Sequence, residues 1–321
     1  MSDIDTIKKM LSFKRPAGSK AEAAFIHEFI KPLGVKRDAF GNHVLAVGQD
    51  NPSILWSCHT DSVHTKHGKQ HVDFDGKFLR LPQNSKSNCL GADDAAGVWI
   101  MIEMIKAKVP GLYVFHAAEE IGCVGSRNIA KKQPDFLANI KAAIAFDRRG
   151  TDSVITHQGS RCCSDSFGRS LKDQLPPRFK LDPTGVLTDT KMYMKLVPEC
   201  TNISVGYYRE HSPGEILDVE HLIELRDFMV SIDPTSFVIE RDPKFVEPKP
   251  KAHGKTSKIV QQLSMLRDRR EETMYDLVYW HPKVVAELLQ DAGVSYEDLK
   301  DHIEASGTPA FDYGDYDPMV A

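Results

Sequence analysis

The segment Ser53-Ile-Leu-Trp-Ser-Cys-His-Thr-Asp61 is an apolar run that ends directly in a histidine and an aspartate. A short run with so few polar residues is typical of a strand buried on both faces of a sheet. Three further strand-like runs are Gly111–Ala117, Ala142–Phe146 and Thr201–Val205. Each of these runs also has an acidic residue or a histidine at its end or a few residues beyond it.

Helical patterns alternate with these strand-like runs. Apolar residues recur at helical spacing in Ser19–Leu33, Ala95–Lys106 and Val219–Ile232, and turn residues divide Asp38–Val47 and Val72–Leu81 as in hairpins. Strands that alternate with helices predict an α/β fold, with a largely parallel central sheet and helices on both of its faces. Such folds bind ligands beyond the carboxyl ends of the strands.

The chain of 321 residues is long enough for one large domain with an appendage. We expect a single catalytic domain over residues 1–240. Residues 241–256 contain three prolines and five basic residues, which favours a linker. Residues 257–321 are expected to form a C-terminal helical appendage that ends in an acidic tail.

Composition excludes several classes of partner. The net charge is −4 and basic residues are not gathered into a dense stretch, so no nucleic-acid partner is expected. No apolar run approaches the roughly 20 residues that span a bilayer, and the N-terminus lacks a signal-peptide pattern, so we expect no membrane partner and a cytoplasmic location. The six cysteines form no CxxC pair and are expected to be free thiols.

Five acidic or histidine clusters follow one another along the chain, and four of them come after the strand-like runs. They are His59-Thr60-Asp61, Gly91-Ala-Asp-Asp94, Glu119-Glu120, Asp147 and His211. Three carboxylates and two imidazoles at one edge of a sheet are a suitable ligand set for two divalent metals. The clusters together therefore predict a dinuclear metal site.

Each cluster alone has a simpler interpretation. His59 and Asp61 would suit a surface turn, or a metal ligand and the carboxylate that fixes its tautomer. Asp93 or Asp94 would cap the helix that follows, which is compatible with metal binding. The adjacent acids Glu119 and Glu120 would both be solvated before a turn. Alternatively, one carboxylate would bind the metal and the other would lie near a water as general base.

The last two clusters are the weakest when read alone. Asp147 follows a buried strand and needs a partner, for which Arg148 and Arg149 are candidates. His211 lies in the loop sequence Glu-His-Ser-Pro-Gly-Glu and carries no signal by itself. Their place in the ordered set gives both residues their interest.

The ordered set resembles the co-catalytic zinc metallopeptidases, among them peptidase T, carboxypeptidase G and the bacterial leucyl aminopeptidases. The resemblance covers about residues 5–235. It rests on the segments Ser57–Asp61, Gly91–Gly97, Ala118–Gly122, Ala145–Asp147 and Glu210–Glu215, with Phe40-Gly41-Asn42 as an early addition.

The resemblance implies a role for each ligand. His59, Asp93 and Asp147 would hold one zinc ion; Asp93, Glu120 and His211 would hold the other, with Asp93 as the bridge. Co²⁺ or Mn²⁺ are possible substitutes. Three carboxylates and a bridging hydroxide balance the four positive charges of two Zn²⁺ ions.

The resemblance also implies roles beside the ligands. Glu119 would be the general base, and Asp61 would orient His59. The Asp93–Asp94 peptide would be cis. Peptidase T carries a lid and dimerisation domain between its last two ligand segments, but here only 63 residues separate Asp147 from His211. We therefore expect the chain to lack that domain.

Hydrolysis of the amide bond of short peptides, as in an aminopeptidase, is the function that this resemblance implies. An N-acyl amino acid deacylase is an alternative, and a catalytically inactive binding relative is a third. An aminopeptidase needs an acid for the substrate amine, whereas a deacylase needs a cation for the carboxylate. The candidates are Asp189 or Glu210 for the former, and Arg148, Arg149, Arg161 or Lys191 for the latter. The oligomeric state stays open.

Overall fold

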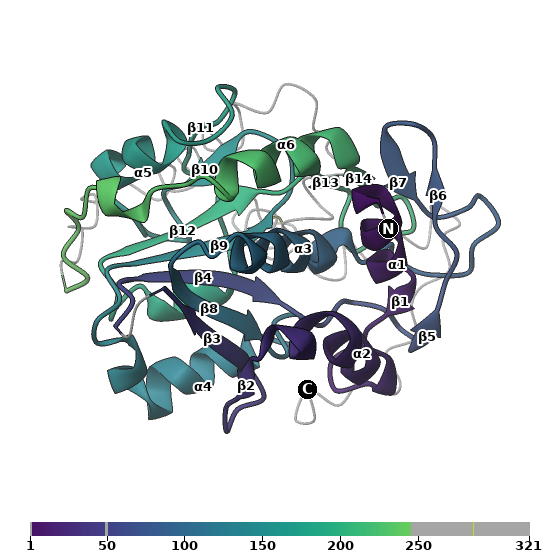
Figure 1. The fold of residues 1–321 in the computed structure, drawn as a ribbon, viewed down its shortest axis with the longest axis horizontal. Helices are drawn as coiled ribbons and strands as arrows, with labels where there is room; N and C mark the ends of the chain where they lie inside the picture. The colour runs from purple at the N-terminus through teal and green to yellow at the C-terminus, as the bar shows by residue number, and fades with distance from the viewer. Residues whose placement is uncertain (1, 49–50, 245–284, 286–321) are drawn as a thin grey trace, which may run out of the picture. The chain divides into compact units, whose positions relative to one another are not determined.

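A computed structural model describes residues 2–48, 51–244 and 285 of the chain. Its largest element is an eight-stranded sheet in the order β11-β10-β12-β9-β4-β8-β3-β2 (Figure 1). The four middle strands, β12 (Glu199–Ser204), β9 (Ala142–Arg148), β4 (Ile54–His59) and β8 (Gly111–His116), run parallel to one another. Antiparallel strands flank them on both sides. The predicted α/β fold with a largely parallel central sheet is confirmed.

The remaining elements surround these four strands. The sheet is completed by β2 (Lys36–Arg37), β3 (His43–Val47), β10 (Ser153–Ile155) and β11 (Lys180–Asp182). A four-stranded antiparallel sheet contains β6 (Asp73–Phe74), β7 (Phe78–Arg80), β13 (Tyr207–Tyr208) and β14 (Ile216–Asp218), and a two-stranded one contains β1 (Phe13–Lys14) and β5 (Gly68–Lys69). The α-helices are α1 (Asp3–Leu11), α2 (Lys20–Phe25), α3 (Ala92–Lys106), α4 (Val124–Lys132), α5 (Asp165–Lys172) and α6 (Val219–Met229).

Two hydrophobic cores cover the two faces of the large sheet. Side chains of a strand alternate between faces, so Ile54, Trp56 and Cys58 of β4 join one core together with α1, α3 and α6. Leu55 points the other way, into a second core that contains Ile129 of α4. Because both faces are covered by helices, β4 is buried along its whole length.

The helix expected over Ser19–Leu33 is present but changes its winding. After α2 the chain makes a π-helical turn, Ile26–Ile30, and a 3₁₀ turn, Lys31–Leu33. Pro32 lacks the N–H that a continuing helix needs, so the helical segment ends in this 3₁₀ turn. The hairpin expected over Val72–Leu81 is found as β6–β7. The hairpin expected over Asp38–Val47 is found as β2–β3, but its first strand lies just before Asp38.

Residues 148–210, between the last two ligand segments, contribute β10, α5, β11, β12, β13 and the 3₁₀ helix η4 (Asp189–Tyr193). Three of these strands belong to the large sheet. The prediction that the chain lacks a lid and dimerisation domain stays a prediction. So do the domain bounds, because the expected linker and helical appendage lie outside the described residues except for residues 241–244 and 285.

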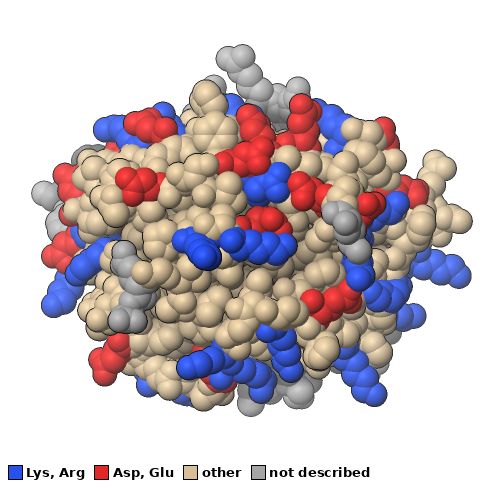
Figure 2. All heavy atoms as spheres, viewed as in Figure 1, with Lys and Arg blue, Asp and Glu red and all other residues tan. Residues whose placement is uncertain are grey.

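Basic and acidic side chains are intermingled over the face of the molecule seen in Figure 2. Among the residues that the structure describes, no helix combines the length and apolar character needed to cross a membrane. All six cysteines are buried free thiols.

Candidate metal centre

The strand ends bring three of the five clusters together. His59 is the last residue of β4, Asp147 lies near the end of β9, and Glu119-Glu120 follow β8 by a few residues. Because β4 pairs in parallel with both β8 and β9, their carboxyl ends lie at one edge of the sheet. The sequence expectation that these side chains gather there agrees with the structure.

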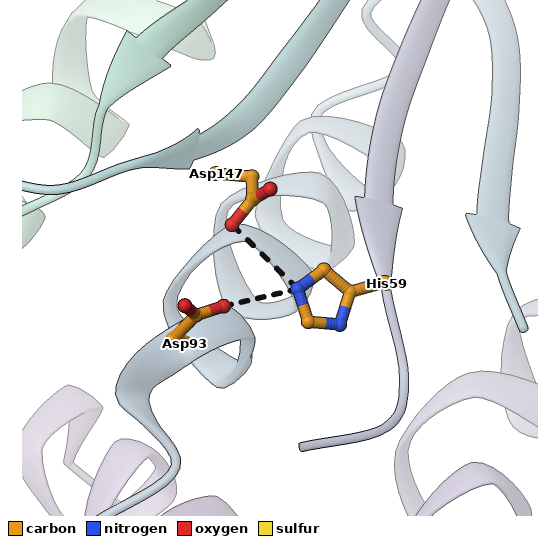
Figure 3. Close-up of side chains that lie close together, drawn as sticks. All are labelled: His59, Asp93 and Asp147. Carbon is orange, nitrogen blue, oxygen red and sulfur yellow. Dashed lines mark hydrogen bonds and ion pairs between the residues drawn. The ribbon is translucent and has the colours of Figure 1, made fainter. Parts of the chain in front are cut away.

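Asp93 reaches the same edge from the first turn of α3 (Figure 3). The helix packs closely on β9, since a Cβ atom on Gly97 would collide with the Phe146 carbonyl oxygen. Only glycine permits this approach. The peptide between Asp93 and Asp94 is cis, as the resemblance implied.

His59, Asp93 and Asp147 form the first group of potential ligands. The His59 Nε2 atom lies 3.0 Å from Asp93 Oδ1 and 3.6 Å from Asp147 Oδ1, as the dashed lines in Figure 3 show. The three donor atoms lie within 4.8 Å of one another. One imidazole nitrogen and two carboxylate oxygens at this spacing suit a small divalent cation.

Asp93, Glu120 and His211 form the second group. The His211 Nε2 atom lies 3.2 Å from Asp93 Oδ2 and 3.1 Å from Glu120 Oε2. His211 belongs to the loop between β13 and β14 and has a φ of 61°. The two oxygens of Asp93 thus face different histidines, which is the arrangement that a bridging carboxylate requires.

Burial and mutual repulsion shape the acid–base properties of the centre. Burial raises the pKa of Glu120 to about 7, with the Asp93 charge adding to the effect. Burial also raises the pKa of Glu119 well above its usual range. Burial acts to lower the pKa of His59, but the carboxylates of Asp147, Asp61 and Asp93 around it raise its pKa well above the ordinary value. Acids crowded in this way favour a positive charge among them.

The donor set fits two divalent cations. Carboxylate and imidazole are the ligands that Zn²⁺, Co²⁺ and Mn²⁺ share. Within the described part of the chain, the Glu120 Oε1 atom is buried and has no hydrogen-bond partner. A bound cation would satisfy such an acceptor.

Asp61 connects two of the clusters. Its Oδ1 atom accepts a hydrogen bond from the Glu119 N–H at 3.0 Å and lies 3.4 Å from His59 Nδ1. Its Oδ2 atom accepts the Glu120 N–H at 3.2 Å. Asp61 is therefore placed to orient His59, and it also holds the Glu119-Glu120 turn, which the sequence did not indicate.

Asp93 and Asp94 have different partners, and only Asp94 caps the helix. Asp94 accepts the Gly97 N–H at 2.9 Å and the His59 N–H at 3.1 Å, so it acts as the helix-capping residue. Asp93 faces the histidines. The salt-bridge candidates beside Asp147 have ion pairs elsewhere: Arg148 lies 3.4 Å from Asp182 and Arg149 lies 3.4 Å from Glu210.

The partners of Asp147 were missed at the level of sequence. Thr188 donates its hydroxyl to Asp147 Oδ2 at 2.7 Å, and Tyr207 donates to Oδ1 at 3.0 Å. Asn202 accepts the Asp147 N–H at 2.8 Å through its side-chain oxygen. These residues lie 41 to 60 positions away along the chain, and no local spacing marks them.

Known peptidases are similar to this chain in sequence and in fold. The model for Peptidase family M28 matches residues 42–162, a range that includes His59, Asp93, Glu120 and Asp147. No curated protein sequence matches the chain. The TET1 peptidase of Pyrococcus horikoshii has a similar structure, with a TM-score of 0.54 and 16% identity over 71% of this chain and 98% of that one.

Two bacterial peptidases are similar to the same degree. Aminopeptidase PepT from Bacillus cereus gives a TM-score of 0.54 and 14% identity over 71% of this chain and 96% of its own. A tripeptidase from Staphylococcus aureus gives 0.56 and 13%, over 71% and 95%. The resemblance to the co-catalytic zinc metallopeptidases is confirmed. Family match and fold together support a metal-dependent, aminopeptidase-like hydrolase.

Proposed function

We propose that the chain holds two zinc ions and hydrolyses the amide bond at the N-terminus of short peptides. The observation that carries the proposal is the position of Asp93, whose two carboxylate oxygens face His59 and His211 at 3.0 and 3.2 Å. A carboxylate shared by two groups of potential ligands is the central requirement of a dinuclear site.

Each candidate residue has a defined role in this proposal. His59, Asp93 and Asp147 hold one ion, and Asp93, Glu120 and His211 hold the other. When bound, the two ions polarise the scissile carbonyl and lower the pKa of the attacking water. Co²⁺ or Mn²⁺ would substitute for Zn²⁺ because they accept the same ligands.

Glu119 serves as the general base. It takes the proton of the attacking water on a carboxylate oxygen and passes it to the leaving amine. Two contacts fix its position: Asp61 accepts its N–H at 3.0 Å, and the Cys123 thiol donates to its Oε1 at 3.3 Å. The raised pKa that burial gives Glu119 makes its carboxylate a stronger proton acceptor than a solvated glutamate.

The substrate amine is read by Glu210. Its Oε1 atom pairs with Arg149 at 3.4 Å, whereas its Oε2 atom has no hydrogen-bond partner in the part of the chain that the structure describes. Glu210 directly precedes His211, and the charges of Asp93 and His211 both act on its pKa, which burial raises. Asp189, the other acid considered, is buried and already accepts the Ser126 hydroxyl at 2.5 Å.

The deacylase alternative is less well supported. A deacylase would need a cation for the substrate carboxylate, and each candidate cation already has a partner: Asp182 for Arg148, Glu210 for Arg149, Asp165 for Arg161 and the Val186 carbonyl oxygen for Lys191. Glu210 differs from them because its Oε2 atom stays without a hydrogen-bond partner among the described residues. The two activities are separated by comparing a free tripeptide with its N-acetylated form. The proposal expects kcat/KM to be at least about tenfold higher for the free peptide, a preference that corresponds to about 1.4 kcal/mol.

Two measurements test the proposal. Elemental analysis of protein purified without chelator should find close to two equivalents of zinc, and a single equivalent that added metal does not activate would contradict the bridge at Asp93. Glu210→Gln should raise KM for the free tripeptide and leave hydrolysis of the acetylated form unchanged. A preference for the acetylated peptide in the unaltered chain would favour the deacylase.

A further inference from the structure

A buried arginine joins the first two ligand segments. Arg15 follows β1 and is completely buried. Its Nε atom donates to the Thr60 carbonyl oxygen at 3.0 Å, and its Nη2 atom donates to the Gly91 carbonyl oxygen at 3.0 Å. The guanidinium also lies 4.5 Å from the centre of the Phe25 ring. Arginine provides several donors in a rigid planar arrangement, which lets one side chain hold two backbone segments at a fixed distance.

A buried glutamate joins the second ligand segment to the fifth. Glu215 lies four residues after His211, and its side chain is buried. Its carboxylate accepts three backbone N–H groups: Leu90 at 2.8 Å, Gly91 at 2.9 Å and Asp93 at 3.0 Å. Charge-assisted hydrogen bonds of this kind are stronger than neutral ones. The loop that carries His211 is thereby attached to the backbone of Asp93.

The two side chains meet at one residue. Gly91 gives its carbonyl oxygen to Arg15 and its N–H to Glu215. Its φ of +77° lies in the left-handed region, where glycine is favoured. The positive Arg15 therefore holds the carbonyl group of Gly91, and the negative Glu215 holds its N–H group, two residues before Asp93.

We propose that Arg15 and Glu215 are positioning residues that hold the His59, Asp93 and His211 segments in register for two metal ions. The inference rests on the proposed function. Neither side chain belongs to the two ligand groups, and the hydrogen bonds by which they join these segments all go to backbone atoms. Glu215 joins Asp93 to the His211 loop, and its loss should mainly affect the group formed by Asp93, Glu120 and His211.

Glu215→Gln is the decisive variant. The amide keeps one acceptor oxygen but turns an NH₂ group toward a backbone N–H, and it removes the charge. In zinc titrations against a competing chelator, one of the two binding steps should weaken about 10–100-fold, while the other should stay within about threefold of the unaltered protein. Glu215→Asp, which keeps the charge and both acceptors, should recover part of the loss.

Arg15→Lys is an independent second variant. Lysine keeps the positive charge but cannot hold two carbonyl groups in a fixed geometry. We expect a loss of zinc affinity of about 10–100-fold. The temperature of thermal unfolding, measured at saturating zinc, should be close to that of the control variant Arg241→Lys.

The chain offers a matched control for each change. Glu199 is a buried carboxylate that accepts the N–H groups of Ser164, Glu240 and Arg241. Arg241 donates to the carbonyl oxygens of Met194, Val197 and Pro198. Glu199 pairs with Ala142, at the opposite end of β9 from Asp147. Glu199→Gln and Arg241→Lys should lower thermal stability without changing zinc affinity.

The outcomes separate the inference from the function on which it rests. Two zinc equivalents in the unaltered chain, with unchanged affinities at both steps in Glu215→Gln and Arg15→Lys, would overturn the positioning role alone. If Glu215→Gln is insoluble, unchanged affinity in Arg15→Lys is sufficient to overturn that role. Fewer than two equivalents in the unaltered chain would contradict the proposed function and the positioning role together.

Discussion

Replacing Asp61 by asparagine tests whether the carboxylate that supports the ligands matters as much as the ligands. Asp61 is completely buried and touches three groups. It accepts the N–H groups of Glu119 and Glu120 at 3.0 and 3.2 Å, and its Oδ1 atom lies 3.4 Å from His59 Nδ1. Asparagine keeps the shape and one acceptor oxygen, but its NH₂ group must face one of these backbone donors or the histidine.

The size of the effect follows from the contacts that are lost. A hydrogen bond to a charged group contributes about 1.5–3 kcal/mol, and Asp61→Asn removes the charge and one acceptor. The contact with His59 is long, so we place most of the loss on the Glu119-Glu120 turn. We expect zinc affinity or kcat/KM to fall about 10–100-fold, the range found for carboxylates behind a ligating histidine.

Zinc competition titrations and kcat/KM at saturating zinc measure the two effects separately. Circular dichroism checks that the variant folds. Glu199→Gln is the control, because it removes a buried carboxylate that holds backbone N–H groups at the other end of the sheet. If Asp61→Asn binds zinc and turns over substrate as the unaltered chain does, the reasoning from these contacts is refuted.

Three further outcomes are expected. Glu119→Gln should keep the zinc content and lower kcat at least about a hundredfold; full activity would remove Glu119 from the mechanism. Tyr207→Phe removes the hydroxyl that donates to Asp147 at 3.0 Å, and zinc affinity should fall about fivefold, for a hydrogen bond of about 1 kcal/mol; an unchanged affinity would show that Thr188 alone suffices. Burial lowers the pKa of His221 to about 4 in the folded chain, whereas the pKa in the unfolded chain is about 6.5. As the pH falls from 7 to 5, the unfolded chain therefore binds a proton at this residue and the folded chain does not. The free energy of unfolding should fall by about 2 kcal/mol over this range. His221→Asn should therefore show a smaller drop in the free energy of unfolding over this pH range, and an equal drop would place the loss on other groups.

The sequence predicted the strands that carry the candidate site because burial on both faces leaves a plain signal. β4 and β9 are continuous apolar runs, and a polar residue at the end of such a run must lie at the sheet edge. His59 and Asp147 were found in this way. The exact start of α3 was not predictable: the apolar pattern begins at Ala95, whereas the helix begins at Ala92, with non-helical dihedral angles at Asp93 and Asp94.

Helices α1 and α5 were not among the elements that the sequence predicted, although both carry local signals. In helix α1 the signal is a capping box that Ser2 and Asp5 form at its start. Helix α5 is similarly capped by Ser164. Capping residues therefore mark the starts of both helices in the sequence.

Residues that position the ligands were beyond the reach of sequence patterns for a different reason. Arg15 contacts residues 45 and 76 positions away, and Glu215 contacts residues more than 120 positions away. Both act on backbone atoms, which every residue possesses, so the contacted segments carry no matching side chain. Only the folded chain reveals these contacts.

In the candidate centre, different residues bind the metal and hold the backbone in place. The potential donors gather negative charge, so that Asp93, Glu120 and Asp147 repel one another until cations bind. The backbone turn that presents Asp93 is instead held by one positive and one negative side chain, which lie outside the ligand groups. Loss of a donor should therefore abolish a metal position, whereas loss of a positioning residue should only weaken it. A graded fall in zinc affinity in one set of variants and an all-or-none loss in the other would distinguish the two tasks.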